Sequence, residues 1–267
     1  MSEAQYIFSR SQFVSELDRL QLLETVCDPA THKKLGSTGL TQGWHCLEVG
    51  VGAGSILSWM SAIVGELGKV VGVDIDTRFV RDVALSNVET IEADIRHLIL
   101  PESSFDLIHA RNVFIHLADY PIALSKMLAL LKPGGWLAIE EPDFSAVRPI
   151  VASDRECQAM NNVNRAIFQM FADRGMDYAL GIKLPSIFQQ LGLQQLTVEN
   201  HVPLSNGGSI VATMMKLSAI QLADKYIATG AATRDDIQQY CQLAENPNTW
   251  AIYQATAGAI GQKPFNK

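Results

Sequence analysis

The chain has 267 residues, 48% of them hydrophobic and 18% charged, and its formal net charge is -7 with a pI near 5.4. An acidic chain without a cluster of Lys or Arg repels a phosphate backbone, so we expect no nucleic-acid partner. No apolar run reaches the roughly 18 residues that a membrane span needs, and the N-terminus lacks the basic and apolar regions of a signal peptide, which favours a cytoplasmic location.

The cysteines and histidines carry no recognisable metal or disulfide pattern. The four cysteines are scattered, and the six histidines lack the HxxxH or HxxE spacing of metal ligands. We therefore expect no metal site and interpret the thiols as buried or idle side chains.

The first half of the chain is predicted to open with a helix and to continue as a parallel α/β pattern. Apolar residues recur at helical spacing from Ser11 to Val26, and Asp28-Pro29 interrupts that pattern. From Trp44 onward, short apolar runs alternate with amphipathic stretches, as in a sheet with crossover helices. The expected strands are residues 45–49, 69–73, 88–93, 105–110 and 136–140. Helices are expected at 56–64, at 77–85, and from 119 to a stop at Lys132-Pro133-Gly134-Gly135.

The second half is predicted to be mainly helical. Residues 149–181 fit no further strand and helix repeat, and we interpret them as a cap. A helix at 185–191 and a sixth strand at 196–202 follow, then two helices, the second opened by Thr233 and Asp236 as a capping box, and a last strand within 251–261.

Four parts are therefore expected along the chain. They are an N-terminal helical lid (1–40), a cofactor-binding α/β core (41–148), a helical cap (149–182) and the C-terminal part of the core sheet (183–267). A helical insertion near 209–246 interrupts the last part and is expected to pack near the cap or against a second subunit of a homodimer, because Met214, Met215, Leu217 and Ile220 form an apolar stripe.

A glycine-rich turn, Glu48-Val49-Gly50-Val51-Gly52-Ala53-Gly54, follows the first strand. Gly50 lets the chain turn out of the strand, and the missing Cβ atoms of Gly52 and Gly54 let a cofactor lie against the backbone. The amides at the helix start suit a carboxylate or a sugar oxygen. The spacing departs from the dinucleotide pattern GxGxxG/A, which counts against NAD. Glu48 is placed to accept hydrogen bonds from loop amides or from the ammonium of a bound amino acid.

Two further acids end the next two strands. Asp74 lies about 20 residues beyond Gly54, a position suited to accept from both ribose hydroxyls of an adenosine. Asp94 follows the third strand and is suited to accept from the adenine amine, with Ile75 and Ile95 on the two faces of the ring. Three carboxylates thus close three successive strands.

These motifs, at residues 48–54, 71–74, 93–95, 105–107 and 131–136, closely resemble the ordered motifs of class I S-adenosylmethionine-dependent methyltransferases. The resemblance covers roughly residues 6–143, and in detail it is to the bacterial small-molecule branch that includes the quinone-biosynthesis enzymes. It implies a Rossmann-like, doubly wound seven-stranded sheet whose last strand is antiparallel, to which the helical cap is added. It also implies that Glu48 and the glycines hold the methionine end of the cofactor, Asp74 the ribose and Asp94 the adenine.

Further candidate residues follow the fourth strand. Arg111 and Asn112 lie at the carboxyl edge of the sheet, where open α/β sheets bind ligands, so we assign them to the cofactor site. His116 comes shortly afterwards, either as a residue that fixes the loop or as a general base.

The fifth strand ends in three acids. By alternation Glu140 points into a core and needs a partner, whereas Glu141 or Asp143 faces the acceptor as a weak base or an orienting group. His116 and Glu141 are therefore the candidate catalytic residues.

The sequence predicts S-adenosylmethionine-dependent methyl transfer to a small, largely apolar acceptor. Methyl transfer is an in-line displacement in which the cofactor carries most of the driving force, so alignment matters more than a base. The alternative is a protein that binds the cofactor without methylating, such as a cyclase or a regulatory binder. An apolar acceptor pocket or plain core are the two interpretations of Tyr6, Phe8, Met170, Phe171 and Met176.

Overall fold

The computed structural model describes residues 7–8, 13–81 and 84–265 and divides the chain into two compact units. The first, which we call the α/β unit, comprises Cys27–Glu141, Lys183–Glu199 and Gly258–Lys267. The second, which we call the helical unit, comprises the residues up to Val26, Pro142–Ile182 and Asn200–Ala257. The four-part division expected from the sequence stays a prediction.

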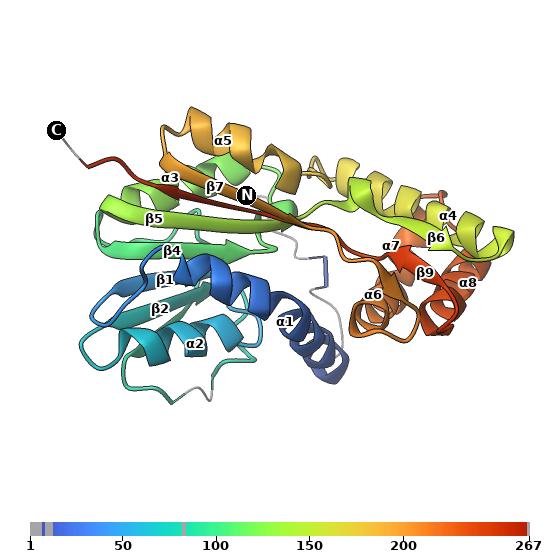
Figure 1. The fold of residues 1–267 in the computed structure, drawn as a ribbon, viewed down its shortest axis with the longest axis horizontal. Coiled ribbons are helices and arrows are strands. Elements are labelled where there is room, and N and C mark those ends of the chain that lie inside the picture. The colour runs from blue at the N-terminus through green and yellow to red at the C-terminus, as the bar shows by residue number, and fades with distance from the viewer. Residues whose placement is uncertain (1–6, 9–12, 82–83, 266–267) are drawn as a thin grey trace. The chain divides into compact units, whose positions relative to one another are not determined.

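The α/β unit is built on a seven-stranded sheet with the order β3-β2-β1-β4-β5-β10-β7 (Figure 1). The strands β3 to β5 are parallel neighbours, and the last strand, β10, is antiparallel, which confirms the predicted Rossmann-like fold. The bounds are β1 (His45–Val49), β2 (Lys69–Asp74), β3 (Val88–Glu92), β4 (Phe105–Arg111), β5 (Leu131–Pro142), β7 (Gln194–His201) and β10 (Thr256–Gln262).

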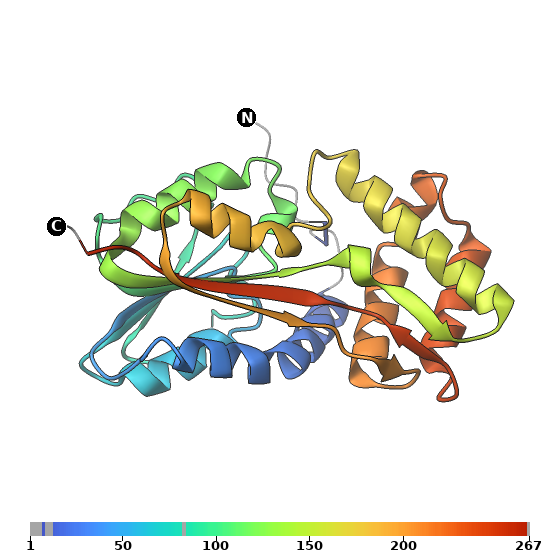
Figure 2. The same ribbon diagram turned by 45° about the horizontal axis from the view of Figure 1, so that its top comes forward.

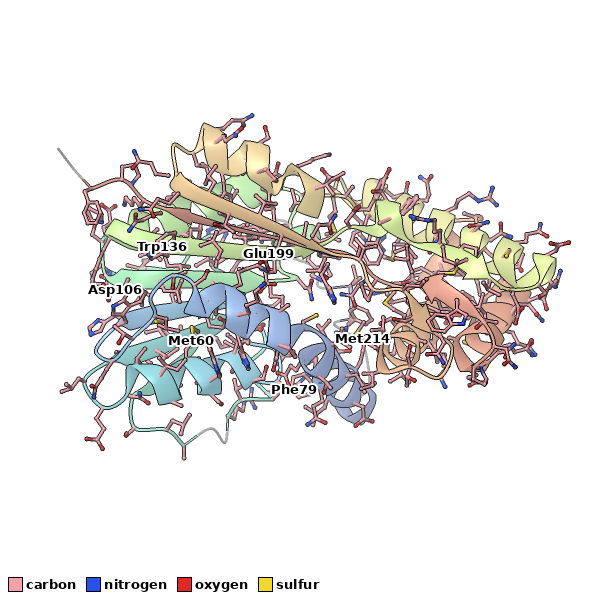
Figure 3. All side chains as sticks on the ribbon, in the orientation of Figure 1. Met60, Phe79, Asp106, Trp136, Glu199 and Met214 are labelled. Carbon is pink, nitrogen blue, oxygen red and sulfur yellow. The ribbon has the colours of Figure 1, made fainter. Side chains whose placement is uncertain are left out.

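Helices cover both faces of this sheet, as expected for a doubly wound fold (Figure 2). On one face lie α2 (Ser55–Val64) and the part of α1 (Phe13–Gly36) that follows Val26, and on the other lie α3 (Tyr120–Leu130) and α5 (Leu184–Gln190). Leu35, Leu57 and Met60 are fully buried between the first pair and the sheet, and Figure 3 labels Met60 in this layer. Close packing here requires a glycine in β2, because a Cβ on Gly72 would lie 2.9 Å from the Leu57 side chain.

Two predicted elements of the α/β unit were wrong. The helix expected at 77–85 is a turn in the described residues 77–81 and 84–85. Polar side chains make local hydrogen bonds there that compete with a helix. Asp76 accepts from the Arg78 amide at 3.2 Å, and the Thr77 hydroxyl donates to Glu92 at 2.8 Å.

The N-terminal helix does not end at Asp28-Pro29 but continues to Gly36 with Pro29 inside it. Proline removes one backbone donor, a loss that is offset by tertiary contacts of the following turns. Thr31 and Lys34 both donate to the buried Glu140 of the sheet.

The helical unit contains a small antiparallel sheet with the order β6-β9-β8 and four main helices. The helix α4 packs on α7 and α8, and α6 packs on both of them. The predicted capping box of α8 is present, because the Thr233 hydroxyl accepts from the Asp236 amide and Asp236 accepts from the Thr233 amide. The bounds are β6 (Arg148–Val151), α4 (Asp154–Ala172), β8 (Ser205–Asn206), α6 (Ile210–Gln221), α7 (Ala223–Ala228), α8 (Arg234–Glu245) and β9 (Trp250–Ile252). Short 3-10 turns lie at Phe144–Ala146 and Gly181–Lys183, and the α/β unit has another at Phe114–His116.

Apolar side chains of the helical unit serve as core. The methionines Met214 and Met215 of α6 are buried, whereas Ile220 of the same predicted stripe is 53% exposed. Met170 and Phe171 are also buried, as their plain-core interpretation requires. Tyr6 lies outside the described residues. None of the described helices combines the length and the apolar character that crossing a bilayer requires.

Candidate active site

The glycine-rich turn joins β1 to α2 in a left-handed backbone conformation. Gly50, Gly52 and Gly54 have φ of 77°, 55° and 95°, values that side chains rarely allow. No described side chain caps α2, whose N-cap residue is Gly54. The positive end of the α2 dipole therefore faces this turn, which suits an anionic group of a ligand.

Gly50 is also enclosed by the loop that follows β4. A Cβ at this position would lie 2.3 Å from Cγ2 of Val113. Gly50→Ala should therefore force the turn and the Val113 loop apart and strain φ by about 1 to 2 kcal/mol. We expect calorimetry to detect no cofactor binding by this variant, while Gly39→Ala, at a left-handed glycine with open space around it, keeps wild-type affinity. Wild-type affinity in Gly50→Ala would show that the turn does not need this conformation.

The carboxylate of Asp74, at the end of β2, lies beside the glycine turn. It accepts from the Gly52 amide at 3.3 Å and from the Asp76 amide at 3.0 Å. Burial raises the pKa of Asp74 to about 6, although the two amides oppose this rise. The next residue, Ile75, is 44% exposed. An acceptor and an exposed apolar side chain thus stand together at this edge of the sheet.

Asp94, after β3, is engaged by a cation that the sequence analysis did not consider. Nε of Arg96 lies 3.0 Å from both carboxylate oxygens, and the same guanidinium reaches Asp119 at 2.6 Å. The hydrogen bonds with Arg96 hold the pKa of Asp94 below its usual range. Ile95 is buried, at 5% exposure, in contrast to Ile75. The adenine contacts of Asp94 and Ile95 stay predictions.

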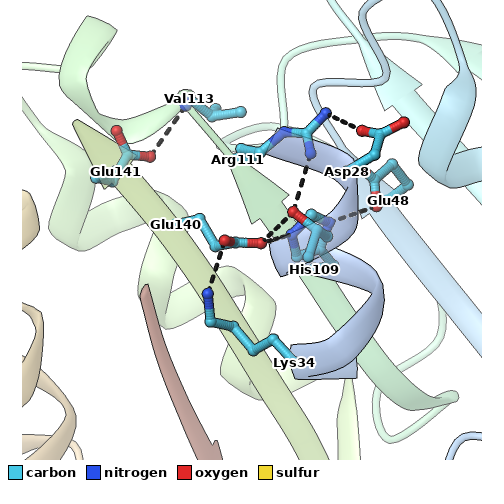
Figure 4. A network of polar contacts seen from close by, with 9 residues as sticks. Asp28, Lys34, Glu48, His109, Arg111, Val113, Glu140 and Glu141 are labelled. Atoms are coloured by element: carbon cyan, nitrogen blue, oxygen red, sulfur yellow. Dashed lines mark hydrogen bonds and ion pairs between the residues drawn. The ribbon is translucent and has the colours of Figure 1, made fainter. Parts of the chain in front are cut away.

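The side chain of Glu48 does not point to the loop amides but into a buried network between strands (Figure 4). Its Oε2 lies 2.8 Å from Nδ1 of His109, its neighbour across the β1 and β4 pairing. Nε2 of His109 lies 3.2 Å from Oε1 of Glu140 on β5. Lys34 and Thr31 of α1 each donate to Glu140 at 2.7 Å. As predicted, Glu140 points inward and has partners.

Arg111 is turned toward α1. It donates to the Thr31 hydroxyl and to Asp28, both at 2.9 Å. The following residue, Asn112, has a left-handed φ of 58°, and its Oδ1 is buried without a hydrogen-bond partner among the described residues. An unpaired buried acceptor at the carboxyl edge of the sheet suits a ligand donor. The cofactor contacts of Arg111 and Asn112 stay predictions.

Glu141 is fully buried and holds the loop after β4 in place. It accepts from the amides of Val113, Phe114 and Ile115 at 2.8 to 3.0 Å. Burial raises the pKa of Glu141 to about 7, against the effect of these amides. This arrangement favours the orienting role over the weak base.

The other two candidates near Glu141 lie in turns. The half-buried His116 ends the short 3-10 turn that Glu141 anchors. Asp143 closes a turn of its own by accepting from the amide and hydroxyl of Ser145 at 2.9 and 2.5 Å. The catalytic roles of His116 and Glu141 stay predictions.

Sequence reasoning missed the side chains that complete the network, namely Asp28, Thr31, Lys34 and His109, and it also missed Arg96, which pairs with Asp94. The signal for His109 was present, because a histidine inside the apolar strand 105–110 must be buried and therefore needs partners. The contributions of α1 had no such signal, since Asp28-Pro29 marked the expected helix end.

Comparisons with known proteins show what the part of the chain that carries the glycine-rich turn resembles. A family model described as a methyltransferase domain matches residues 47–139. A ubiquinone/menaquinone biosynthesis C-methyltransferase, UbiE, of Pseudoalteromonas translucida is 30% identical over 115 residues, which are 40% of this chain and 46% of that protein. The chain thus spans about half the length of the curated relatives it matches.

Solved structures show the same fold. The phosphoethanolamine N-methyltransferase 2 of Haemonchus contortus aligns with a TM-score of 0.61 at 15% identity, over 99% of this chain and 61% of that one. The [4+2]-cyclase SpnF aligns with a TM-score of 0.53 at 18% identity, over 90% and 81%. The family match over residues 47–139, the ordered motifs and the sheet order together support a class I S-adenosylmethionine-dependent methyltransferase domain.

Proposed function

We propose that this protein transfers the methyl group of S-adenosylmethionine to a small, largely apolar acceptor. The observation that carries the proposal is the left-handed glycine turn with the Asp74 carboxylate beside it, 3.3 Å from the Gly52 amide. An acceptor at the end of the second strand, next to a glycine-rich turn, suits the ribose of an adenosine.

The residues present fit the cofactor in chemical type. Asp74 offers two oxygens to ribose hydroxyls, and the positive end of the α2 dipole suits the carboxylate of the methionine end. The unpaired Oδ1 of Asn112 is buried and available to a donor. Glu48, 3% exposed, provides a carboxylate for the ammonium group.

The bound cofactor supplies an electrophilic methyl group on a sulfonium, with a neutral thioether as the leaving group. The task of the chain is to bind the cofactor and the acceptor and to align them. In well-oriented reactions, such alignment lowers the activation barrier by roughly 7 to 11 kcal/mol. Glu141 serves this task by fixing the backbone of residues 113–115 at the carboxyl edge of the sheet. Alignment contributes more to this chemistry than the roughly 10²- to 10⁴-fold that a general base typically provides.

Two observations support a small acceptor over a polymer. The net charge of -7 disfavours nucleic acid, and the UbiE relative is named for methylation in quinone biosynthesis. We extend the small-molecule character to this chain, while the kind of acceptor atom is left open.

The test is an acceptor screen with methyl-labelled S-adenosylmethionine. Quinones, phenols and fatty acids form one group, and protein lysate and RNA form the other. We expect S-adenosylhomocysteine to form together with label in an extractable small molecule, and mass spectrometry then identifies the product. Label in the protein or RNA fraction alone would refute the acceptor class, whereas cofactor binding with no transfer to either group would favour the non-methylating alternative.

A further inference from the structure

We infer that His109 is a positioning residue for the cofactor: it is held as an imidazolium between Glu48 and Glu140 and fixes the Glu48 carboxylate for the ammonium group of the methionine end. The inference rests on the proposed function and adds a residue that does not itself contact the cofactor. Figure 4 shows the buried network in which His109 lies between the two glutamates.

The number of protons in the network follows from the donors and acceptors present. Nδ1 of His109 lies 2.8 Å from Glu48 and Nε2 lies 3.2 Å from Glu140, so both ring nitrogens face carboxylate oxygens. A neutral imidazole has one N–H and one lone pair, and an ionised carboxylate only accepts. With a neutral imidazole and two ionised carboxylates, only one of the two contacts can be a hydrogen bond. Both are hydrogen bonds when His109, Glu48 and Glu140 together hold one additional proton.

That proton does not reside on Glu140. Its carboxylate already accepts from Lys34 and Thr31, each at 2.7 Å, in addition to His109. Burial favours the protonated form of Glu140, but the contacts with His109 and Lys34 outweigh burial and hold its pKa well below the usual range.

Between Glu48 and His109 the proton belongs to the more basic group. An unperturbed imidazole has a pKa about two units above that of a carboxyl group. Burial disfavours the imidazolium, but the attraction of Glu48 and the hydrogen bond to Glu140 raise the pKa of His109 to about 9. His109 is completely buried, so its charge is not screened by water.

The surrounding charges balance only with this proton in place. Besides His109 and the two glutamates, the titratable groups of this network are Lys34, Asp28 and the thiol of Cys27 on α1, and Arg111 on β4. Burial raises the pKa of Cys27 to about 11, so the thiol is neutral. Apart from Glu141, whose carboxyl group accepts from three backbone amides, three cations then match three carboxylates, whereas a neutral His109 leaves an excess buried negative charge, which is costly.

The consequence for the cofactor lies in the second oxygen of Glu48. Oε2 is held by His109, and Oε1 has no hydrogen-bond partner within the described residues. Glu48 is two positions before Gly50, so the residue lies at the carboxyl end of β1, where the cofactor turn begins. Without the imidazolium, the Glu48 carboxylate, which is 3% exposed, loses its neighbouring cation and its fixed orientation. The ammonium group of the methionine end then loses an acceptor in a defined position.

The test compares two ligands on the full chain. S-adenosylhomocysteine contains the amino-acid end, and 5′-methylthioadenosine has the same nucleoside without it. For His109→Gln we expect calorimetry to show the affinity for S-adenosylhomocysteine lowered about 10- to 100-fold and that for 5′-methylthioadenosine unchanged. Asp74→Ala should weaken both ligands. The control for non-specific effects of a substitution is Lys33→Met, which replaces an exposed lysine next to Lys34 in the sequence.

A merely structural role of His109 would weaken both ligands alike, and equal losses or no loss for S-adenosylhomocysteine would overturn the inference. A second measurement does not depend on the variant being folded. Nitrogen NMR of the wild-type ring should find both nitrogens of His109 protonated up to about pH 9, and an unprotonated Nδ1 near neutral pH would contradict the imidazolium. If the wild type binds neither ligand, the proposed function fails, while the NMR result still decides the protonation of His109.

Discussion

Replacing Asp74 with alanine should lower the affinity for S-adenosylmethionine at least about 100-fold. Two hydrogen bonds from ribose hydroxyls to a charged acceptor are lost, each contributing about 1.5 to 3 kcal/mol, and 1.4 kcal/mol corresponds to a tenfold change. The matched control is Asp76→Ala, because Asp76 is a nearby acid that pairs with Arg78 instead of the glycine turn. Titration calorimetry of both variants measures the effect, and wild-type affinity in Asp74→Ala would remove Asp74 from the site.

The same carboxylate should make cofactor binding sensitive to pH. Burial raises the pKa of Asp74 to about 6, so the free protein holds a proton there at lower pH. The charged acceptor is complete only above that value, and the affinity should therefore fall as the pH decreases through 6. Asp74→Asn carries no titratable group at this position, and its affinity should not share that step. A step of equal size in the variant would assign it to another group.

Replacing Lys34 with methionine should destabilise the fold by about 3 to 5 kcal/mol. Its ammonium group pairs with Glu140 at 2.7 Å, and the two side chains are only 5% and 2% exposed. Removal of one partner leaves a buried charge without full compensation. Denaturant unfolding, followed by a probe in the α/β unit, measures the loss.

The control for this prediction is the neighbouring residue. Lys33→Met removes a lysine whose side chain is 76% exposed and whose partner is Glu199, so we expect a change of at most about 1 kcal/mol. Gly258→Ala disturbs the same ion pair between Lys34 and Glu140 in a different way, because the added Cβ would lie 2.2 Å from Nζ of Lys34. Similar stability of Lys34→Met and Lys33→Met would show that the buried pair contributes little.

Sequence patterns predicted those parts of the site whose cause is local. The left-handed turn follows from the missing side chains of Gly50, Gly52 and Gly54, and the place of Asp74 follows from where a parallel strand ends. The inward direction of Glu140 follows from the alternation of side chains in a strand. Each of these properties is fixed by a few neighbouring residues.

The partners of these residues could not be predicted in the same way. The contact between Glu48 and His109 depends on the register of two strands whose contacting residues are 61 positions apart. The roles of Thr31 and Lys34 depend on a helix that continues through Pro29, because contacts with the sheet stabilise a turn that local propensity disfavours. The sequence analysis assigned Asp94 to adenine and did not consider Arg96, a cation two residues away that donates hydrogen bonds to both carboxylate oxygens of Asp94.

The position of β10 in the sheet has a consequence for the order of assembly. The strand lies between β5 and β7, so β7 meets the other strands through a segment that is translated later, after residues 202–255. Until β10 arrives, β7 has no strand to pair with in this sheet and the edge of β5 has unpaired backbone groups. Completion of the sheet is therefore a late, long-range step of folding, and during synthesis these two edges are the ones exposed to wrong pairing or to chaperones.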